Sequence, residues 1–374
     1  MITPQAPLAW LLVAVAGAAL GRLVVWTVRP LVATDDAGRP VPPPAGFGRW
    51  FPVVALLAAL ALWWWEVVCR GQLPTGIVAT GDDGSLLVRY AAHLVLFALL
   101  AAASWVDLRQ RIIPDVITMP GVLVGLAWNT LAPASLLPIA VDVPRSFAPP
   151  LPEPDVLGLA GGLRASLPAW LESQPAWLGL LAAWGVFIGW WRGCTAPFLE
   201  PVGPAGWLRE PRHLALVAGV VGIAAAWWRG GPGWPALLTG LAGLLVAAGM
   251  IWLTRAGASR ALGREAMGLG DVTLMAMVGS WLGWQPCVLT CFLAVFLGLA
   301  HGVLQVIRHR ESELPFGPSL CLAATLVVIA WRPLWERVAE PFARPLDMAA
   351  VIAAVIGLTA VSLMVWRRLR PSLG

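Results

Sequence analysis

The sequence predicts an all-α protein, a polytopic bundle of transmembrane helices, on the strength of its composition and the length of its apolar segments. Apolar residues make up 59% of the 374 residues and charged residues 12%, and the mean hydropathy is +0.78. A soluble domain carries about twice that share of charged residues. The apolar segments recur at about the 20-residue length that a helix needs to cross a bilayer. Since lipid offers no hydrogen bonds to the backbone, we expect each segment to be a helix.

We expect about eight to eleven membrane segments. The apolar runs cover approximately residues 8–28, 51–68, 89–106, 115–132, 176–191, 213–228, 235–253, 272–284, 286–307, 318–331 and 348–366. The run 272–284 is short, and Trp284 and Pro286 indicate a break near its end. A polar connector follows the first run at 29–50, and a Pro/Gly-rich insertion lies around 133–212.

The basic residues indicate membrane topology rather than a nucleic-acid partner. All 25 are arginines, and they lie mostly singly or in pairs at the ends of apolar runs. If the N-terminus lies outside, the inside loops hold roughly twice as many arginines as the outside loops. This orientation places residues 107–114 and 254–271 on the same, cytoplasmic side of the plasma (inner) membrane. Anionic lipid headgroups are the expected partners of these charges.

Two aspartates stand at the ends of apolar runs. Asp107 directly follows HLVLFALLAAASWV, and Asp271 directly precedes VTLMAMVGSWLGW. An ionisable residue at membrane depth is costly, so both are candidates for function. Asp271 ends a Gly268-Leu-Gly270-Asp string, in which the glycines permit tight turns and close approach of another chain. Alone, this string is more typical of a glycine turn with an aspartate at a helix start than of a catalytic motif.

The segment after Asp107 contains a break between two helices. Pro114 interrupts the chain, and Asp115 follows it at the expected start of the next helix, where a carboxylate acts as a cap. Arg109 and Arg111 are typical of positive anchors on the inner side. By itself, Asp107 is also compatible with a solvated loop acid.

Together the two aspartates suggest a hydrolytic site. Two carboxylates in a low-dielectric site cannot both ionise easily, so their pKa values separate. The ionised carboxylate then takes a proton from water, while the protonated one polarises a carbonyl group. The sequence has no HExxH, GxSxG or P-loop motif, its four histidines are isolated from one another, and its five cysteines form no CxxC. We therefore expect neither a metal nor a cofactor.

Three strings, in the same order, resemble the type IV prepilin peptidase family of GxGD-type membrane aspartyl peptidases. Residues 107–129 resemble its first aspartate motif, with Pro-Asp, Thr-x-Pro and Gly-Leu-x-x-Asn. Residues 266–285 (AMGLGDVTLMAMVGSWLGWQ) resemble its second motif, and 315–318 (PFGP) resemble a later string. These matches cover about 50 residues in three separate places, which makes the combination more specific than any single string.

The resemblance implies an endopeptidase that removes the short basic leader of prepilins or pseudopilins at the cytoplasmic membrane face, for a type IV pilus or type II secretion. It implies that Asp107 and Asp271 are catalytic. Gly268 and Gly270 would shape the loop of the second aspartate, and Pro114 that of the first, next to Asp115. Residues 1–50 would form the first span and a degenerate cytoplasmic loop, and 51–374 the peptidase domain.

Departures from the family leave alternatives open. Many bacterial members carry two cysteine pairs that bind zinc in the loop after the first span, associated with N-methylation of the product, whereas 29–50 has no cysteine. Ala55 stands where the family usually has Glu, and Thr273 where it often has Lys. We therefore do not expect methyltransferase activity. The alternatives to a peptidase are a catalytically degenerate scaffold of a pilus or secretion apparatus and, less favoured, a proton-coupled transporter.

Overall fold

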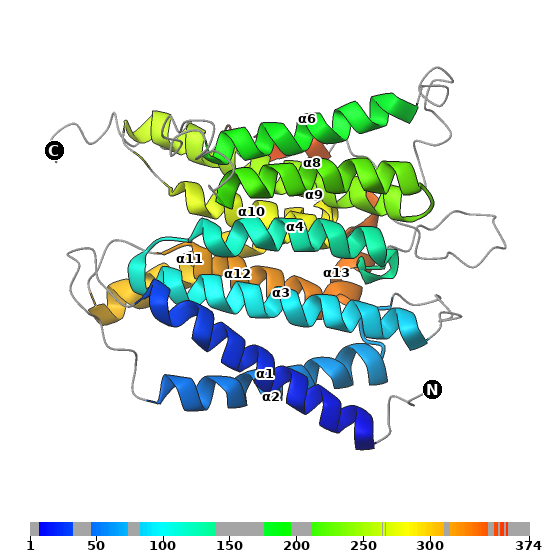
Figure 1. Ribbon diagram of the computed structural model, residues 1–374. Coiled ribbons are helices and arrows are strands. Elements are labelled where there is room, and N and C mark those ends of the chain that lie inside the picture. Colours follow the sequence, from blue (N-terminus) through cyan, green and yellow to red (C-terminus); the bar gives the residue numbers. More distant parts are fainter. Residues whose placement is uncertain are drawn as a thin grey trace, which may run out of the picture.

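The computed structural model is a bundle of roughly parallel helices, with no strand among the residues that it describes (Figure 1). These residues are 7–32, 46–73, 83–138, 176–195, 211–263, 265, 267–309, 315–342, 348–350, 352–354 and 357. The helices are α1 (Pro7–Leu31), α2 (Phe47–Trp63) with its π-helical end η1 (Trp64–Val68), α3 (Asp83–Gln110), α4 (Asp115–Leu131), the 3-10 turn η2 (Pro133–Ser135), α6 (Ala176–Thr195), α8 (Pro211–Arg229), α9 (Gly233–Leu262), α10 (Leu269–Leu282), α11 (Trp284–His309), α12 (Gly317–Ile329) and α13 (Trp331–Phe342).

The protein is a multi-pass membrane protein, as the sequence predicts. Within the described part of the chain, five helices are long and apolar enough to cross a membrane, or six if the α12–α13 pair, bent by 83°, is one span. This number is smaller than the eight to eleven segments that we expect from apolar runs. Part of the difference arises because α4 and α10 are apolar but have only 17 and 14 residues, short of the roughly 20 that a crossing needs.

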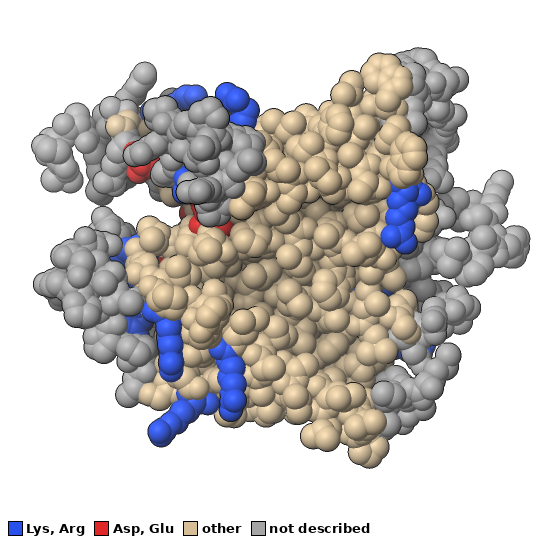
Figure 2. Space-filling model, in the orientation of Figure 1, with Lys and Arg blue, Asp and Glu red and all other residues tan. Residues whose placement is uncertain are grey.

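The outer surface of the bundle is apolar, as a lipid-facing surface must be. Large hydrophobic side chains stay exposed along the helices, among them Leu11, Trp26, Val221 and Phe296. Figure 2 shows that this surface carries few charged residues along its length, with arginines gathered mainly at the end of the bundle where α3 turns into α4. This uneven distribution agrees with the arginine bias in the sequence.

Helix α10 lies at the centre of the bundle. Every residue from Asp271 to Leu282 is buried, and α10 contacts α9, α4, α11, α12, α3 and α6. A helix that is apolar on all sides is expected in such a position. Helix α10 ends at its C-cap Gly283, whose φ of 82° lies in the left-handed region that favours glycine. The predicted break after this run is therefore present, and α11 begins at the next residue.

The first two helices form a hairpin at one side of the bundle (Figure 1). Along their contact, a Cβ on Gly17 would lie 2.6 Å from the Cβ of Ala59, and one on Gly21 would lie 2.7 Å from that of Ala55. These glycines allow the close packing of α1 on α2. A small cluster that includes Val13, Leu62 and Tyr90 joins the hairpin to α3.

Candidate active site

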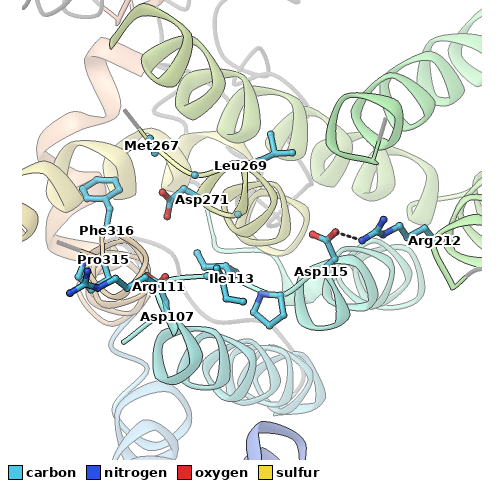
Figure 3. A pocket seen from close by; sticks show the side chains of 14 residues that line it. Asp107, Arg111, Ile113, Asp115, Arg212, Met267, Leu269, Asp271, Pro315 and Phe316 are labelled. Atoms are coloured by element: carbon cyan, nitrogen blue, oxygen red, sulfur yellow. Dashed lines mark ion pairs between the residues drawn. The ribbon is translucent and has the colours of Figure 1, made fainter. Parts of the chain in front are cut away.

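A pocket of about 550 Å³ lies where α3 turns into α4 and where the chain enters α10. Asp107 and Asp271 both line it, and Figure 3 shows them on two sides of the pocket, from α3 and α10. Both residues are largely buried, with exposed fractions of 5% and 8%. The structure thus brings together two carboxylates that lie more than 160 positions apart in the sequence.

Asp107 lies in the last turn of α3, followed by a tight reversal of the chain. The N–H of Arg111 donates to the carbonyl oxygen of Asp107 at 2.8 Å. Arg111 has a φ of 56°, a left-handed conformation that costs a non-glycine residue on the order of 1 kcal/mol or more. The reversal leads to Pro114, which is extended and precedes α4. As predicted, Pro114 marks the break between the two helices.

Asp271 is the third residue of α10, and a close contact with the 111–114 segment places it. A Cβ on Gly270 would lie 2.9 Å from the Cβ of Ile113, so only glycine allows the two segments to meet at this distance. Gly268 lies just before α10 with φ −67° and ψ 154°. It therefore does not use the left-handed conformations open to glycine, and a Cβ there would meet nothing closer than 3.9 Å.

Hydrogen bonds between residues of the two aspartate motifs hold α4 against α10. Asn129 donates from Nδ2 to the carbonyl oxygen of Ser280 at 2.8 Å, and Ser135 donates to Asn129 Oδ1 at 2.9 Å. The indole of Trp281 donates to the carbonyl oxygen of Gly121 at 2.9 Å. These bonds are buried, so losing one leaves an unsatisfied polar group. They connect the helices that follow the two aspartates.

The third string that we single out from the sequence, 315–318, closes the pocket on the side of α12. Pro315 and Phe316 line the pocket, and Gly317 begins α12 next to Asp107. The Oδ2 atom of Asp107 is buried and has no hydrogen-bond partner among the described residues. A buried acceptor of this kind is available to a water molecule or a substrate.

The surroundings of Asp271 favour its protonated form. Burial, and to a smaller extent the charge of Asp107, raises the pKa of Asp271 from 3.8 to about 7. Near neutral pH this carboxyl group can therefore hold a proton. Asp107 provides a second carboxyl group in the same pocket, and two carboxyl groups are what acid–base hydrolysis by aspartates requires.

The prediction that Asp115 caps the helix is wrong, because the N-cap of α4 is Pro114 and no side-chain cap hydrogen bond forms there. Asp115 is the first residue of α4, lines the pocket and pairs with Arg212 of α8, with 3.5 Å between Oδ2 and the guanidinium (Figure 3). Both side chains are about a quarter exposed. From the sequence, Arg212 is only one of several inner arginines, and nothing in its local pattern indicates this contact.

Comparison with known proteins finds a family match that includes one of the two aspartates. Residues 210–303 match the model of the type IV leader peptidase family. The resemblance to that family is confirmed over this region. Asp271 and the two glycines before it lie within the match, whereas Asp107 and Gly317 lie outside it.

Curated relatives have names that agree with this leader-peptidase match. Proteins named prepilin leader peptidase/N-methyltransferase are 41% identical over 70 residues in Pseudomonas aeruginosa, 31% over 97 residues in Aeromonas salmonicida and 36% over 96 residues in Burkholderia pseudomallei. The matches cover 18%, 25% and 24% of this chain and 24%, 32% and 30% of those relatives. The chain thus matches less than a third of their length. No solved structure matches it.

One polar cluster lies outside the pocket of the two aspartates and involves His93, one of the four histidines. His93 Nδ1 lies 2.5 Å from Glu66 Oε1, and Gln72 donates to the same oxygen at 2.5 Å. His93 and Glu66 are 1% and 3% exposed. They lie 27 positions apart in different helices, so sequence spacing could not pair them. Among the described residues, this cluster included, no three His, Cys, Asp or Glu side chains gather as metal ligands do.

Proposed function

We propose that this protein is a membrane aspartyl endopeptidase that uses Asp107 and Asp271 as its catalytic pair. The observation that carries the proposal is that both carboxylates, buried and from different helices, line one pocket at an end of the bundle. The family match over the region of Asp271 supports it. Pro114 and Gly270 shape the two segments that bring the aspartates together, Gly268 lies just before the second of these segments, and Asp115 lies beside them.

The raised pKa of Asp271 suggests how the two roles are divided. Asp271 keeps its proton and donates a hydrogen bond to the scissile carbonyl oxygen, while ionised Asp107 accepts a proton from the attacking water. The water oxygen bonds to the carbonyl carbon and forms a tetrahedral intermediate. Asp107 then gives its proton to the leaving nitrogen and the C–N bond breaks, while the Asp271 proton stays on its carboxyl group and its hydrogen bond stabilises the charge on the former carbonyl oxygen. These steps need only the two carboxyl groups and one water molecule, and no covalent bond forms between the protein and the substrate.

The proposed substrates are prepilin or pseudopilin-like proteins, which lose a short basic leader. The relatives' names support this substrate class. The pocket lies at the arginine-rich end of the bundle (Figure 2), which favours the cytoplasmic face of the inner membrane. A type IV pilus or a type II secretion apparatus is the expected context.

The alternatives account for fewer of these observations. A catalytically degenerate scaffold has no need to keep two buried carboxylates facing one pocket. A proton-coupled transporter predicts broken helices, which the bent α12–α13 pair provides, but also acidic groups near the bilayer midplane. Asp107 and Asp271 instead lie at the ends of α3 and α10.

The test uses the full chain in membrane vesicles, with a prepilin of Pseudomonas aeruginosa as the substrate. We expect Asp107→Asn and Asp271→Asn each to lower cleavage by about 10³-fold or more, because each removes an acid–base group. Mass spectrometry of the product locates the cleavage site after the leader. Full processing by either variant would end the two-aspartate proposal.

A further inference from the structure

Helix α12 ends at a sharp bend, where backbone carbonyl groups lose their usual helical donors. The chain turns by 83° between α12 and α13. Pro333, in the first turn of α13, has no N–H group to donate to the carbonyl oxygen of Ile329 four residues earlier. In a membrane protein, lipid cannot replace such a donor. Another part of the chain must therefore supply it.

Two side chains from the segment that follows α2 supply these donors. Trp65, in η1, donates from its indole Nε1 to the carbonyl oxygen of Ile329 at 2.8 Å. Gln72 lies in the turn after η1 and donates from Nε2 to the carbonyl oxygen of Val328 at 3.0 Å. The bonded residues are 264 and 256 positions apart in the sequence. The end of α12 is thus capped from outside the helix.

The amide of Gln72 is fixed by a second set of bonds. It also donates to Glu66 Oε1 at 2.5 Å, and this oxygen lies 2.5 Å from Nδ1 of His93 on α3. All three side chains are buried, so breaking either bond leaves a polar group with no water to replace its partner. The cap of α12 is therefore tied to α3.

The other end of α12 lies at the candidate catalytic pair. Gly317 begins α12 and packs against the carboxyl group of Asp107, and Phe316, just before it, lines the pocket. The 13 residues of α12 extend about 18 Å along the helix axis. Figure 1 shows α12 alongside α3, with α13 at the end of the bundle away from the turn between α3 and α4. Helix α12 is thus held to α3 at both ends.

Resting on the proposed function, we propose that Gln72 and Trp65 are positioning residues for the reaction, which act through α12 on the place of Gly317 against Asp107. An α-helix carries a displacement of one end to the other, because its backbone hydrogen bonds make it a rigid element. Without the cap, α12 is free to slide or tilt on α3, and Gly317 then moves relative to Asp107. A shift of about 1 Å at a catalytic group can cost about 100-fold in rate. Neither Gln72 nor Trp65 needs to touch the substrate for this effect.

The first experiment removes the two donors one at a time. Gln72→Met nearly keeps the length of the side chain without its amide, and Trp65→Phe keeps an aromatic ring without the indole N–H. Steady-state kinetics uses the full chain in membrane vesicles with the Pseudomonas aeruginosa prepilin. We expect kcat to fall about tenfold in Gln72→Met and about threefold in Trp65→Phe, because the reacting groups lose their alignment. The KM should change by less than about twofold, since substrate binding is not touched.

Trp184→Phe provides the matched control. Trp184 of α6 donates from its indole to the carbonyl oxygen of Val220 in α8 at 3.1 Å, and like Trp65 it is partly buried. The substitution therefore removes the same kind of bond, but between α6 and α8. We expect a drop in melting temperature in detergent similar to that of Trp65→Phe, with kcat within about twofold of the parent protein.

A double-mutant cycle tests whether Gln72 acts through Gly317. In Gly317→Ala, the added methyl group already displaces Asp107, so the position of α12 no longer sets the alignment. We expect Gln72→Met to lower kcat about tenfold in the parent protein but less than about threefold in the Gly317→Ala background. Residues at opposite ends of a helix normally have additive effects. A purely structural role of Gln72 would therefore give the same loss in both backgrounds.

The outcomes separate this inference from the proposed function. With Asp107→Asn inactive, an unchanged kcat in Gln72→Met and Trp65→Phe, or losses that multiply in full with Gly317→Ala, would overturn the inference alone. An equal loss of kcat in Trp184→Phe would show general destabilisation and would also overturn it. If Gln72→Met does not fold, Trp65→Phe takes its place in both comparisons. Full processing by Asp107→Asn would reject the proposed function, and the positioning role with it.

Discussion

Gly317 packs against the carboxyl group of Asp107 so closely that no side chain fits between them. A Cβ on Gly317 would lie 2.5 Å from Asp107 Oδ2 and 2.9 Å from Ile113 Cδ1. The glycine at the start of α12 thus lets the carboxyl group of α3 keep its position in the pocket. The close contact brings the third sequence string directly to the candidate catalytic pair.

For Gly317→Ala, we therefore expect a loss of activity larger than any loss of stability. The added methyl group must displace Asp107, and a displacement of about 1 Å at a catalytic group can cost about 100-fold in rate. Steady-state kinetics with prepilin measures this loss. Gly189→Ala in α6 is the control, since a Cβ there meets nothing within 4 Å. Equal activities of the two variants would show that the contact has no catalytic consequence.

The activity should depend on pH through Asp271. Because the pKa of this group is raised to about 7, it holds its proton below that pH and loses it above, so kcat/KM should fall as the pH rises past about 7. A second fall at acidic pH is expected once the base is also protonated. A profile that stays flat up to pH 9 would contradict the assignment of Asp271 as the acid.

Removing the charge of Asp107 should lower the pKa of Asp271. In Asp107→Asn the repulsion between the two carboxylates is gone, while the burial of Asp271 remains. We expect the carboxyl carbon of Asp271, followed by ¹³C NMR in detergent, to titrate at a lower pH than in the parent protein. An unchanged midpoint would show that the two groups do not interact.

Asp115→Asn should leave substantial activity, in contrast to the two catalytic variants. Its ion pair with Arg212 is partly exposed, and such pairs contribute about 0.2 to 1 kcal/mol. We expect less than about a tenfold change in kcat/KM, corresponding to no more than 1.4 kcal/mol. A loss as large as that of Asp271→Asn would give Asp115 a direct part in the reaction.

The buried Glu66–His93 pair should matter for stability. Glu66→Ala leaves His93 and Gln72 without their shared acceptor inside the bundle, which we expect to cost about 3 kcal/mol in the free energy of unfolding. Denaturant unfolding in detergent measures this cost. Glu336→Ala is the control, because its pair with Arg332 is about 40% exposed and should cost about 0.5 kcal/mol or less. Similar losses in the two variants would argue against an internal role for Glu66.

The product should carry an unmodified N-terminus. The loop at 29–50, which has no cysteine, cannot supply a zinc site of four thiolates; residues 33–45 of it lie outside the described part of the structure. The relatives are named N-methyltransferases as well as peptidases, so the outcome distinguishes this chain from them. Mass spectrometry of a processed prepilin shows whether its new N-terminus is methylated. A terminus heavier by one methyl group, formed by this protein alone, would refute the expectation.

The sequence by itself determined the class of the protein and most of its helices. Long apolar runs with arginines at their ends leave few structures other than membrane helices, because lipid forces each segment to pair its own backbone groups. The helix break at Pro114 and the end of α10 near Trp284 were also predictable, since proline and glycine act locally on the backbone. The candidate aspartates could be selected because each stands at the end of an apolar run.

Only the tertiary structure decided which side chains meet. Four contacts join residues that lie far apart in the sequence or in different elements: Gly270 with Ile113, Gly317 with Asp107, Asp115 with Arg212, and Glu66 with His93. No periodicity within one helix specifies such contacts, because they depend on how several helices pack around α10. For the same reason, the sequence could identify Gly270 as a glycine that matters but not its neighbour, and could not show that the PFGP string closes the pocket at Asp107.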